Sequence, residues 1–202
     1  MWQPATLNNG LEAVGLVGGN YGLGWGISDH RGNKEIGHSG SFINGYTANF
    51  IRFDEFRLAV IVLCNLNPSN AHLISYNLAG FFVTQLKSID QLKEDQHADT
   101  SFNQKVRVLL DGLGNDNLDT SLVTLSYKQR VNPLTKLLFK SQPDHKTSIT
   151  FIHSDQIANK NLVRYGWSIL KINYYKIKLG NETHYLAIYI TSGNKIADIK
   201  GY

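Results

Sequence analysis

The sequence predicts an α+β fold in two parts, because of the order in which its patterns occur. The first part runs through several strand-like segments into one helix, and the second runs through helices into strands. A polar, charge-rich segment at residues 88–101 separates them. Strands and helices that are segregated along a chain favour antiparallel sheets with helices packed on them. We therefore predict domains at 1–87 and 102–202, joined by a linker at 88–101.

Four strands are predicted in the first part. The glycine-rich segment 21–27 is typical of a short strand that another backbone approaches closely, and 34–40 follows as a second strand. Segments 46–53 and 57–64 are longer and are separated by a tight turn, which indicates a hairpin. Every residue of 58–64 is apolar, so we expect a central strand covered on both faces.

A helix is predicted after these strands. Asn67 and Pro68 are a favourable N-cap residue and first helical residue. Apolar residues then recur at helical spacing, at Ile74, Leu78, Phe81 and Phe82. A helix with one apolar face ordinarily buries that face, so we expect these residues to lie on the sheet.

The second part begins with a helical stripe and ends in strands. The stripe consists of Phe102, Val106, Leu109, Leu110 and Leu113. A second helix is expected over 127–139, interrupted near Pro133, and strands are expected at 148–154, 164–179, 183–191 and 195–200. The apolar phase of the long strand slips near Asn173, which predicts a bulge or a strong bend. Two helices on a curved antiparallel sheet is the expected arrangement.

The charge is mild and unevenly distributed. The net charge is +4; residues 1–88 hold five basic and five acidic residues, and 89–202 hold fifteen and eleven. The lysines are spread out, which indicates a solvated face. The sequence pI of about 9.1 is the only feature that favours nucleic-acid binding. We therefore expect no nucleic-acid partner.

Membrane, secretion and metal signals are not visible. No apolar run approaches the roughly 18 to 20 residues that cross a bilayer, and the N-terminus lacks a signal-peptide pattern. The single cysteine, Cys64, lies in an apolar run and is interpreted as a small buried hydrophobe. The histidines show no spacing suited to zinc. We expect no metal and no cofactor.

Several motifs follow one another in the first part. They are Tyr-Gly-Leu-Gly-Trp at 21–25, Gly-His-Ser-Gly-Ser at 37–41, Asn-Gly-Tyr at 44–46, and an apolar strand that ends in Cys-Asn at 64–65. In order and spacing, residues 1–86 resemble the C-terminal portion of β-lactamase-like serine hydrolases. That family includes class C β-lactamases, penicillin-binding D,D-peptidases, D-aminopeptidases and esterases. The set of motifs supports the resemblance, whereas His-Ser-Gly alone would not.

The resemblance implies acyl transfer through a serine ester, on an amide or ester substrate. His38, Ser39 and Gly40 match the His-x-Gly strand that forms one wall of the cleft. By this match His38 would bring a donor or positive charge beside the nucleophile, and Gly40 would leave room for substrate. The backbone N–H of Ser41 would be an oxyanion-hole donor. Asn44 and Tyr46 would border the substrate.

Simpler interpretations exist for the same residues. His38 also suits a strand histidine with satisfied hydrogen bonds. Ser39 and Ser41 also suit turn-forming positions near glycines, and Asn44 and Tyr46 suit a turn that enters a strand.

The nucleophile motif of the family, Ser-x-x-Lys, is expected to be missing from this chain. In family order the Ser-x-x-Lys motif lies far upstream of His-x-Gly, and only 37 residues precede His38. The chain would then be a fragment or a natural truncated remnant, inactive on its own. The alternative is a non-catalytic ligand- or partner-binding module, whose truncated sheet exposes an edge strand that invites self-association.

The second part resembles, in motifs of low specificity, a small cystatin-like domain that trails such hydrolases. The motifs are the helix at 106–114, the strand at 165–179 and the segment Gly-Asn-Lys-Ile-Ala-Asp at 193–198. The resemblance implies an auxiliary role with no catalytic residue. It also implies a bacterial source and a parent family that is often periplasmic or secreted.

Overall fold

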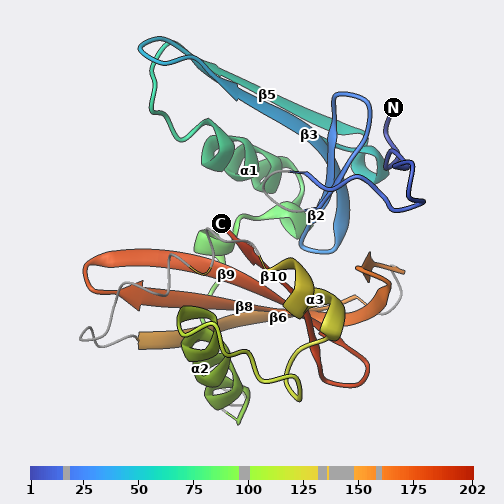
Figure 1. Ribbon diagram of the computed structural model, residues 1–202. Coiled ribbons are helices and arrows are strands. Elements are labelled where there is room, and N and C mark those ends of the chain that lie inside the picture. The colour runs from blue at the N-terminus through green and yellow to red at the C-terminus, as the bar shows by residue number, and fades with distance from the viewer. Residues whose placement is uncertain (16–18, 96–100, 132–135, 137–147, 158–160) are drawn as a thin grey trace. The chain divides into compact units, whose positions relative to one another are not determined.

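The computed structural model describes residues 1–15, 19–95, 101–131, 136, 148–157 and 161–202 (Figure 1). The chain divides into unit 1, Met1–Gln91, and unit 2, Leu92–Tyr202. Each unit combines an antiparallel sheet with helices, so the predicted α+β class is confirmed. Residues 96–100 of the predicted linker, and most of the predicted helix after residue 131, lie outside the described residues.

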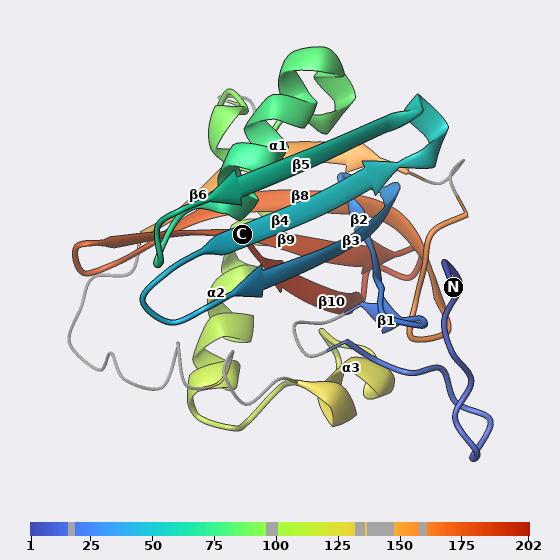
Figure 2. The ribbon, with the colours of Figure 1, turned by 90° about the horizontal axis from the view of Figure 1, so that it is seen from above.

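Unit 1 is built on a five-stranded antiparallel meander in the order β1-β2-β3-β4-β5 (Figure 2). The strands are β1 (Asn20–Tyr21), β2 (Gly26–His30), β3 (Asn33–Ser41), β4 (Thr47–Phe53) and β5 (Leu58–Cys64). The predicted hairpin is confirmed, with a 3-10 turn η1 (Asp54–Phe56) between β4 and β5. The predicted strand 21–27 is interrupted: Tyr21 ends β1, residues 22–25 form a bend, and Gly26 and Ile27 begin β2.

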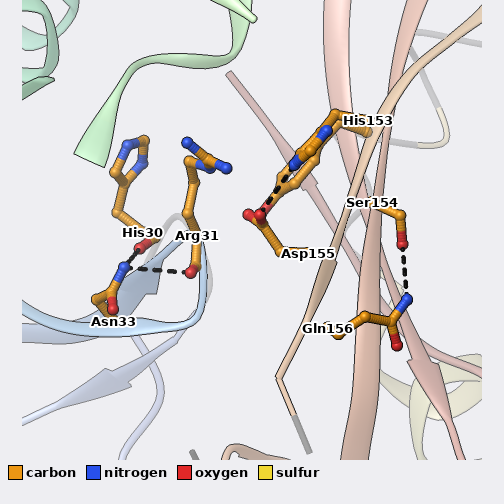
Figure 3. Close-up of polar contacts among 8 residues, drawn as sticks. His30, Arg31, Asn33, His153, Ser154, Asp155 and Gln156 are labelled. Atoms are coloured by element: carbon orange, nitrogen blue, oxygen red, sulfur yellow. Dashed lines mark hydrogen bonds and ion pairs between the residues drawn. The ribbon is translucent and has the colours of Figure 1, made fainter. Parts of the chain in front are cut away.

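A two-residue turn sets the register of β2 and β3. Arg31 and Gly32 both have positive φ, 52° and 72°, as the type I′ hairpin turn requires. The side-chain amide of Asn33 donates to the carbonyls of His30 and Arg31, each at 3.2 Å (Figure 3). The Gly32 N–H donates to Asp29 Oδ2 at 3.1 Å. Because the turn fixes the pairing of His30 with Asn33, it also fixes which side of the sheet each β3 residue faces.

The prediction that β5 is a covered central strand was wrong. β5 pairs with β4 and ends the sheet order, so it is an edge strand. Its residues alternate: Val60 and Val62 are buried, while Ile61 and Leu63 are 61% and 78% exposed. A strand with apolar residues on both faces is typical of a strand that is buried on both faces. The described part of unit 1 covers only one face of β5.

The prediction for the buried face of the helix was also wrong. α1 (Ala71–Phe82) follows Asn70 and packs on β4 and β5. Its buried residues are Ala71, Ser75, Tyr76, Ala79 and Gly80, whereas Ile74, Leu78, Phe81 and Phe82 are exposed. Small side chains let the helix approach its neighbours closely: a Cβ on Gly80 would lie 2.6 Å from Lys87 Cα.

The chain after α1 folds back onto unit 1. Two 3-10 turns, η2 (Thr84–Leu86) and η3 (Ile89–Gln91), follow the helix, and Leu86 and Ile89 are buried. The Ser88 hydroxyl donates to Asn77 Oδ1 of α1 at 2.7 Å. The first residues of the predicted linker are therefore an ordered part of unit 1.

Unit 2 places two helices before a curved antiparallel sheet of order β10-β9-β8-β6, with β7 paired to β8. The elements are α2 (Ser101–Gly114), α3 (Leu125–Arg130), β6 (Ser148–Gln156), β7 (Val163–Arg164), β8 (Trp167–Leu179), β9 (Glu182–Thr191) and β10 (Ile196–Gly201). The predicted α2 stripe is confirmed, because Val106, Leu109, Leu110 and Leu113 share one core with residues of β8, β9 and β10.

The bulge predicted near Asn173 in the long strand lies elsewhere. The pairing of β8 with β9 runs without a shift from Lys171 to Leu179, and its irregularity falls between Ile169 and Lys171. A second irregularity lies in β6, between Phe151 and His153. The apparent change of phase has another cause: residues on both faces of β8 are buried, including the adjacent Tyr174 and Tyr175.

Three tyrosines of unit 2 have a raised pKa. The Tyr174 hydroxyl donates to Asp155 Oδ2 at 2.9 Å, and His153 Nε2 lies 3.2 Å from Asp155 Oδ1 (Figure 3). Burial raises the pKa of Tyr174 well above its ordinary value, and the nearby Asp155 adds to the effect. Burial, and then the carboxylate of Asp198, likewise raise the pKa of Tyr127 and of Tyr165.

Alkaline pH should therefore destabilise unit 2. An unfolded tyrosine loses its proton near pH 10.0, whereas folded Tyr174 keeps it, so the unfolded state is favoured as the pH rises above that value. Tyr174→Phe should reduce the fall in unfolding free energy between about pH 9 and pH 11. Urea unfolding followed by Trp167 fluorescence, with Trp2 and Trp25 replaced by Phe, measures the slope. Tyr46→Phe, in unit 1, is the control; an unchanged slope for Tyr174→Phe would contradict the assignment.

Candidate functional site

The candidate site is centred on the second half of β3, where one edge of the strand is open. The ladder with β2 ends at the pair Gly26–Gly37, while the ladder with β4 continues to Ser41–Thr47. In the described part of unit 1 no strand pairs with residues 38–41 on the β2 side, and all four residues are exposed. An open edge presents backbone N–H and C=O groups that an extended ligand is able to pair with.

His38 is held at this edge by β1. Its Nε2 lies 3.1 Å from the Tyr21 hydroxyl, and the two rings meet edge to face with centroids 6.3 Å apart. In the neutral tautomer with the proton on Nδ1, the tyrosine donates this bond; with Nε2 protonated, the ring donates it. The contact orients the imidazole and leaves its other nitrogen available, as a wall residue requires.

A cavity of about 630 Å³ adjoins the edge. It is lined by residues of β2, β3 and β4, by Tyr21, by Val14 and Gly15, and by His72 of α1. Of the predicted site residues, His38 and Ser39 line it. The structure thus brings these two residues to one hollow.

Polar side chains form the wall of this cavity beside α1. Asn49, paired with Ser39 across the sheet, is buried and donates to Ser75 Oγ at 2.9 Å. The Tyr76 hydroxyl donates to Glu35 Oε2 at 2.8 Å. Glu35, Asn49 and His72 line the cavity. A buried carboxylate and a buried amide beside a hollow are more typical of a site than of a core.

Aromatic contacts fix the rings around Tyr76. The His30 ring stacks on Tyr76 with centroids 4.2 Å apart, and the His72 ring meets it edge-on at 4.5 Å. His30 Nε2 lies 3.1 Å from the Leu86 carbonyl oxygen. These contacts hold the wall of the cavity on three elements: β2, β3 and α1.

Sequence patterns had not indicated Glu35, Asn49, His72 or Tyr21 as site residues. Asn49 does leave a signal, because it is a polar residue at an inward position of β4, where Ile51 and Phe53 are apolar. Glu35 leaves no such signal, because its neighbours on the same side of β3 are polar residues and glycine. His72 and Tyr21 leave none, since their places depend on α1 and β1 folding back onto the sheet.

The other predicted residues lie along the strand and its turn. Gly40 is exposed, and a Cβ there would meet no atom within 4 Å, so the surface beside it is open. Ser41 pairs with Thr47 at the end of β3. Asn44 has φ 67° in the turn between β3 and β4, and Tyr46 is 66% exposed. Gly40, Ser41, Asn44 and Tyr46 are not among the cavity-lining residues, and the turn geometry of Asn44 agrees with its simpler interpretation.

The expectation that the chain holds no Ser-x-x-Lys needs a correction. The pattern occurs twice downstream of His38, at Ser168-Ile-Leu-Lys171 and Ser192-Gly-Asn-Lys195. Ser168 and Lys171 lie in strand β8, where three residues span about 10 Å, whereas on a helix such a pair shares one face. The Lys195 ammonium donates to the Thr120 carbonyl at 3.3 Å. Both occurrences are in unit 2, and both have the reverse of the family order.

Further features bear on what the described residues can do. In the described part of unit 1 no serine hydroxyl is hydrogen-bonded to a lysine or histidine side chain. Among the residues that the structure describes, no group of three or more His, Cys, Asp or Glu is placed to hold a metal ion. None of the helices in those same ranges has both the length and the hydropathy needed to cross a bilayer.

Comparison with known protein families gives a match to part of the chain. Residues 4–84 match the family model described as Beta-lactamase, which covers β1 to β5 and α1. No curated protein and no solved structure is detectably similar to the chain. Unit 1 thus contains a β-lactamase-like segment, which supports a relation to the serine hydrolases of that family. The matched segment includes every predicted site residue.

Removing the donor to Glu35 should weaken unit 1. Tyr76→Phe deletes a hydrogen bond to a buried carboxylate, which should lower the unfolding free energy by about 1–3 kcal/mol. Urea unfolding followed by Trp2 and Trp25 fluorescence, with Trp167 replaced by Phe, measures the change. The exposed Tyr46→Phe is the matched control and should shift the midpoint little. Equal effects of the two substitutions would mean that the Tyr76–Glu35 bond contributes nothing to stability.

Proposed function

We propose that unit 1 forms the substrate-binding wall of a β-lactamase-like serine hydrolase site that transfers an acyl group from an amide or ester. The observation that supports this most directly is the open, exposed edge of β3 at residues 38–41, inside a segment that matches the family model. The nucleophile is proposed to come from a Ser-x-x-Lys segment that is not among these 202 residues. The chain alone is then inactive.

Each edge residue has a proposed role. An extended acyl donor would lie antiparallel to β3 and pair with its backbone. Gly40 leaves room for that donor, because a side chain there would project into open space. The Ser41 N–H would stabilise the oxyanion, a contribution worth about 10²–10³ in rate. His38, oriented by Tyr21, would supply a donor or positive charge beside the attacking serine.

The substrate class is proposed from the resemblance of this strand to the family's His-x-Gly motif. The proposed substrates are small peptides with a D-amino acid, or small esters, as for D,D-peptidases, class C β-lactamases and esterases. Histidine at the first position of the motif, with an open glycine two residues later, supports this group of enzymes by resemblance. The five-stranded sheet of unit 2, with α2 packed on one face, supports a cystatin-like auxiliary domain.

A second candidate function is a non-catalytic binding module. The open edge of β3 supports it as well, because strand addition to an edge needs no nucleophile. Ligand binding separates the hydrolase wall from the binding module, because a binding module would bind peptides without any preference for an acyl donor. Covalent labelling tests whether the chain alone has an active nucleophile.

A fluorophosphonate probe should leave the chain unlabelled. Covalent reaction needs a serine activated by a neighbouring base, and unit 1 presents no such pair among its described residues. Intact-mass spectrometry after incubation with the probe gives the stoichiometry. Labelling of one serine at one equivalent would contradict the proposed inactivity. Ser168→Ala and Ser192→Ala would then identify whether either Ser-x-x-Lys of unit 2 reacts.

Binding at the β3 edge should depend on the open space at Gly40. An N-acylated D-alanyl-D-alanine peptide should shift the amide NMR signals of residues 38–41, and Gly40→Val should weaken its binding about tenfold or more by blocking the edge. Gly201→Val is the matched control, because a Cβ on that strand glycine would likewise meet no atom within 4 Å. If the D-peptide and its all-L counterpart shift these signals equally, the binding-module function is favoured; if neither does, the wall assignment fails.

A further inference from the structure

Two aromatic side chains pack together beside His38. The ring of Trp25 meets the ring of Phe50 edge to face, with centroids 5.1 Å apart. Phe50 of β4 is the cross-strand partner of His38, so the two side chains lie on the same side of the sheet. The Trp25 ring, which contacts Phe50, is therefore on the His38 side as well. Ser39 and its partner Asn49 face the opposite side, and neither Trp25 nor Phe50 is among the residues that line the cavity.

Trp25 lies where the open edge of β3 begins. Gly26 of β2 pairs with Gly37, and Trp25 directly precedes Gly26 in the chain. The N–H of Gly22 donates to the Trp25 carbonyl at 2.8 Å, which closes the bend between β1 and β2. The chain turns away from β3 at this bend. A ligand strand that pairs with the open edge would therefore end next to Trp25.

Strand direction decides which part of an acyl donor reaches Trp25. Under the proposed function, on which this inference rests, the donor runs antiparallel to β3 and the Ser41 N–H binds the oxyanion. A chain antiparallel to β3 that passes Ser41 continues toward His38. The part that follows the scissile carbonyl, the leaving group, therefore points at Trp25. His38 is three residues from Ser41, about 10 Å along the strand, so a leaving group with an extended substituent spans the distance.

We propose that Trp25 and Phe50 form an aromatic subsite that selects acyl donors by their leaving group. The preferred amine or alcohol leaving group carries an aromatic ring. Both side chains are half-buried, so each keeps part of its ring accessible to a ligand. An aromatic ring gains edge-to-face or offset contacts with such a pair, in addition to the apolar area that it buries. The acyl part of the donor, on the far side of Ser41, does not reach this pair.

Two amides that differ by one ring test the subsite. N-acetyl-D-alanine ethylamide and N-acetyl-D-alanine 2-phenylethylamide have the same acyl group, and only the second has a phenyl ring in its leaving group. Each is titrated into the 202-residue chain, and the amide NMR signals of residues 38–41 give the dissociation constant. The phenylethylamide should bind at least about fivefold more tightly. Its ring protons should give nuclear Overhauser effects to the rings of Trp25 and Phe50.

Leucine variants remove one ring of the pair at a time. Trp25→Leu and Phe50→Leu should each reduce the ratio of the two dissociation constants to below about twofold. Trp167→Leu is the matched control: it removes a tryptophan of unit 2 that is 42% exposed, and the ratio should stay as in the unmodified chain. Circular dichroism verifies folding. If neither leucine variant folds, the Overhauser effects in the unmodified chain decide.

The outcomes separate this subsite from the function on which it rests. A preference for the phenylethylamide that both leucine variants abolish supports the subsite. Equal dissociation constants for the two amides, with the signals of residues 38–41 shifted by both, would leave the wall assignment intact and overturn the subsite. Overhauser effects only to other aromatic residues, or a ratio that neither leucine variant changes, would also overturn it. If neither amide shifts these signals, the proposed function and the subsite both fail.

Discussion

The candidate site of unit 1 depends on one constraint: β3 pairs with β4 over more residues than it pairs with β2. β4 follows β3 to Ser41, but β2 stops at Gly37, so the last four residues of β3 have a strand on one side only. Backbone polar groups need partners, and an open edge takes them from water or from a bound chain. The I′ turn at Arg31 and Gly32 sets this arrangement, because it fixes where β2 and β3 begin to pair. The candidate site is thus a consequence of strand lengths as well as of residue types.

The packing of α1 through its small residues has two consequences. A close approach to the sheet lets Ser75 and Tyr76 reach Asn49 and Glu35, so the helix supplies the hydrogen-bonding partners of the cavity wall. The same orientation turns Ile74, Leu78 and Phe82 outward. The helix and the neighbouring edge strand β5 therefore carry large apolar side chains that the described part of unit 1 does not cover. One packing choice therefore connects the polar wall of the site with the exposed apolar side of α1.

The two units bear differently on function. The family match, all the predicted site residues and the cavity lie in unit 1. Unit 2 has the larger core, built by α2 on its sheet, and a set of buried tyrosines whose pKa is raised. Its polar contact between Tyr174 and Asp155 joins neighbouring strands of one sheet. Unit 2 is thus a well-packed domain for which an auxiliary role is proposed.

Local patterns in the sequence determined much of this protein. Alternation and turn residues predicted β3, β4, β5 and most strands of unit 2, helical spacing predicted the buried face of α2, and the motif at 37–41 predicted the strand that has the open edge. Tertiary structure decided whether an apolar surface is covered: β5 and α1 have the composition of buried elements, but burial depends on what packs against them. It also brought Glu35, Asn49, His72 and Tyr21 to one cavity from four different elements. The periodicity of a sequence predicts which side chains share one face of a strand or helix. Which element packs against that face depends on the fold of the whole unit.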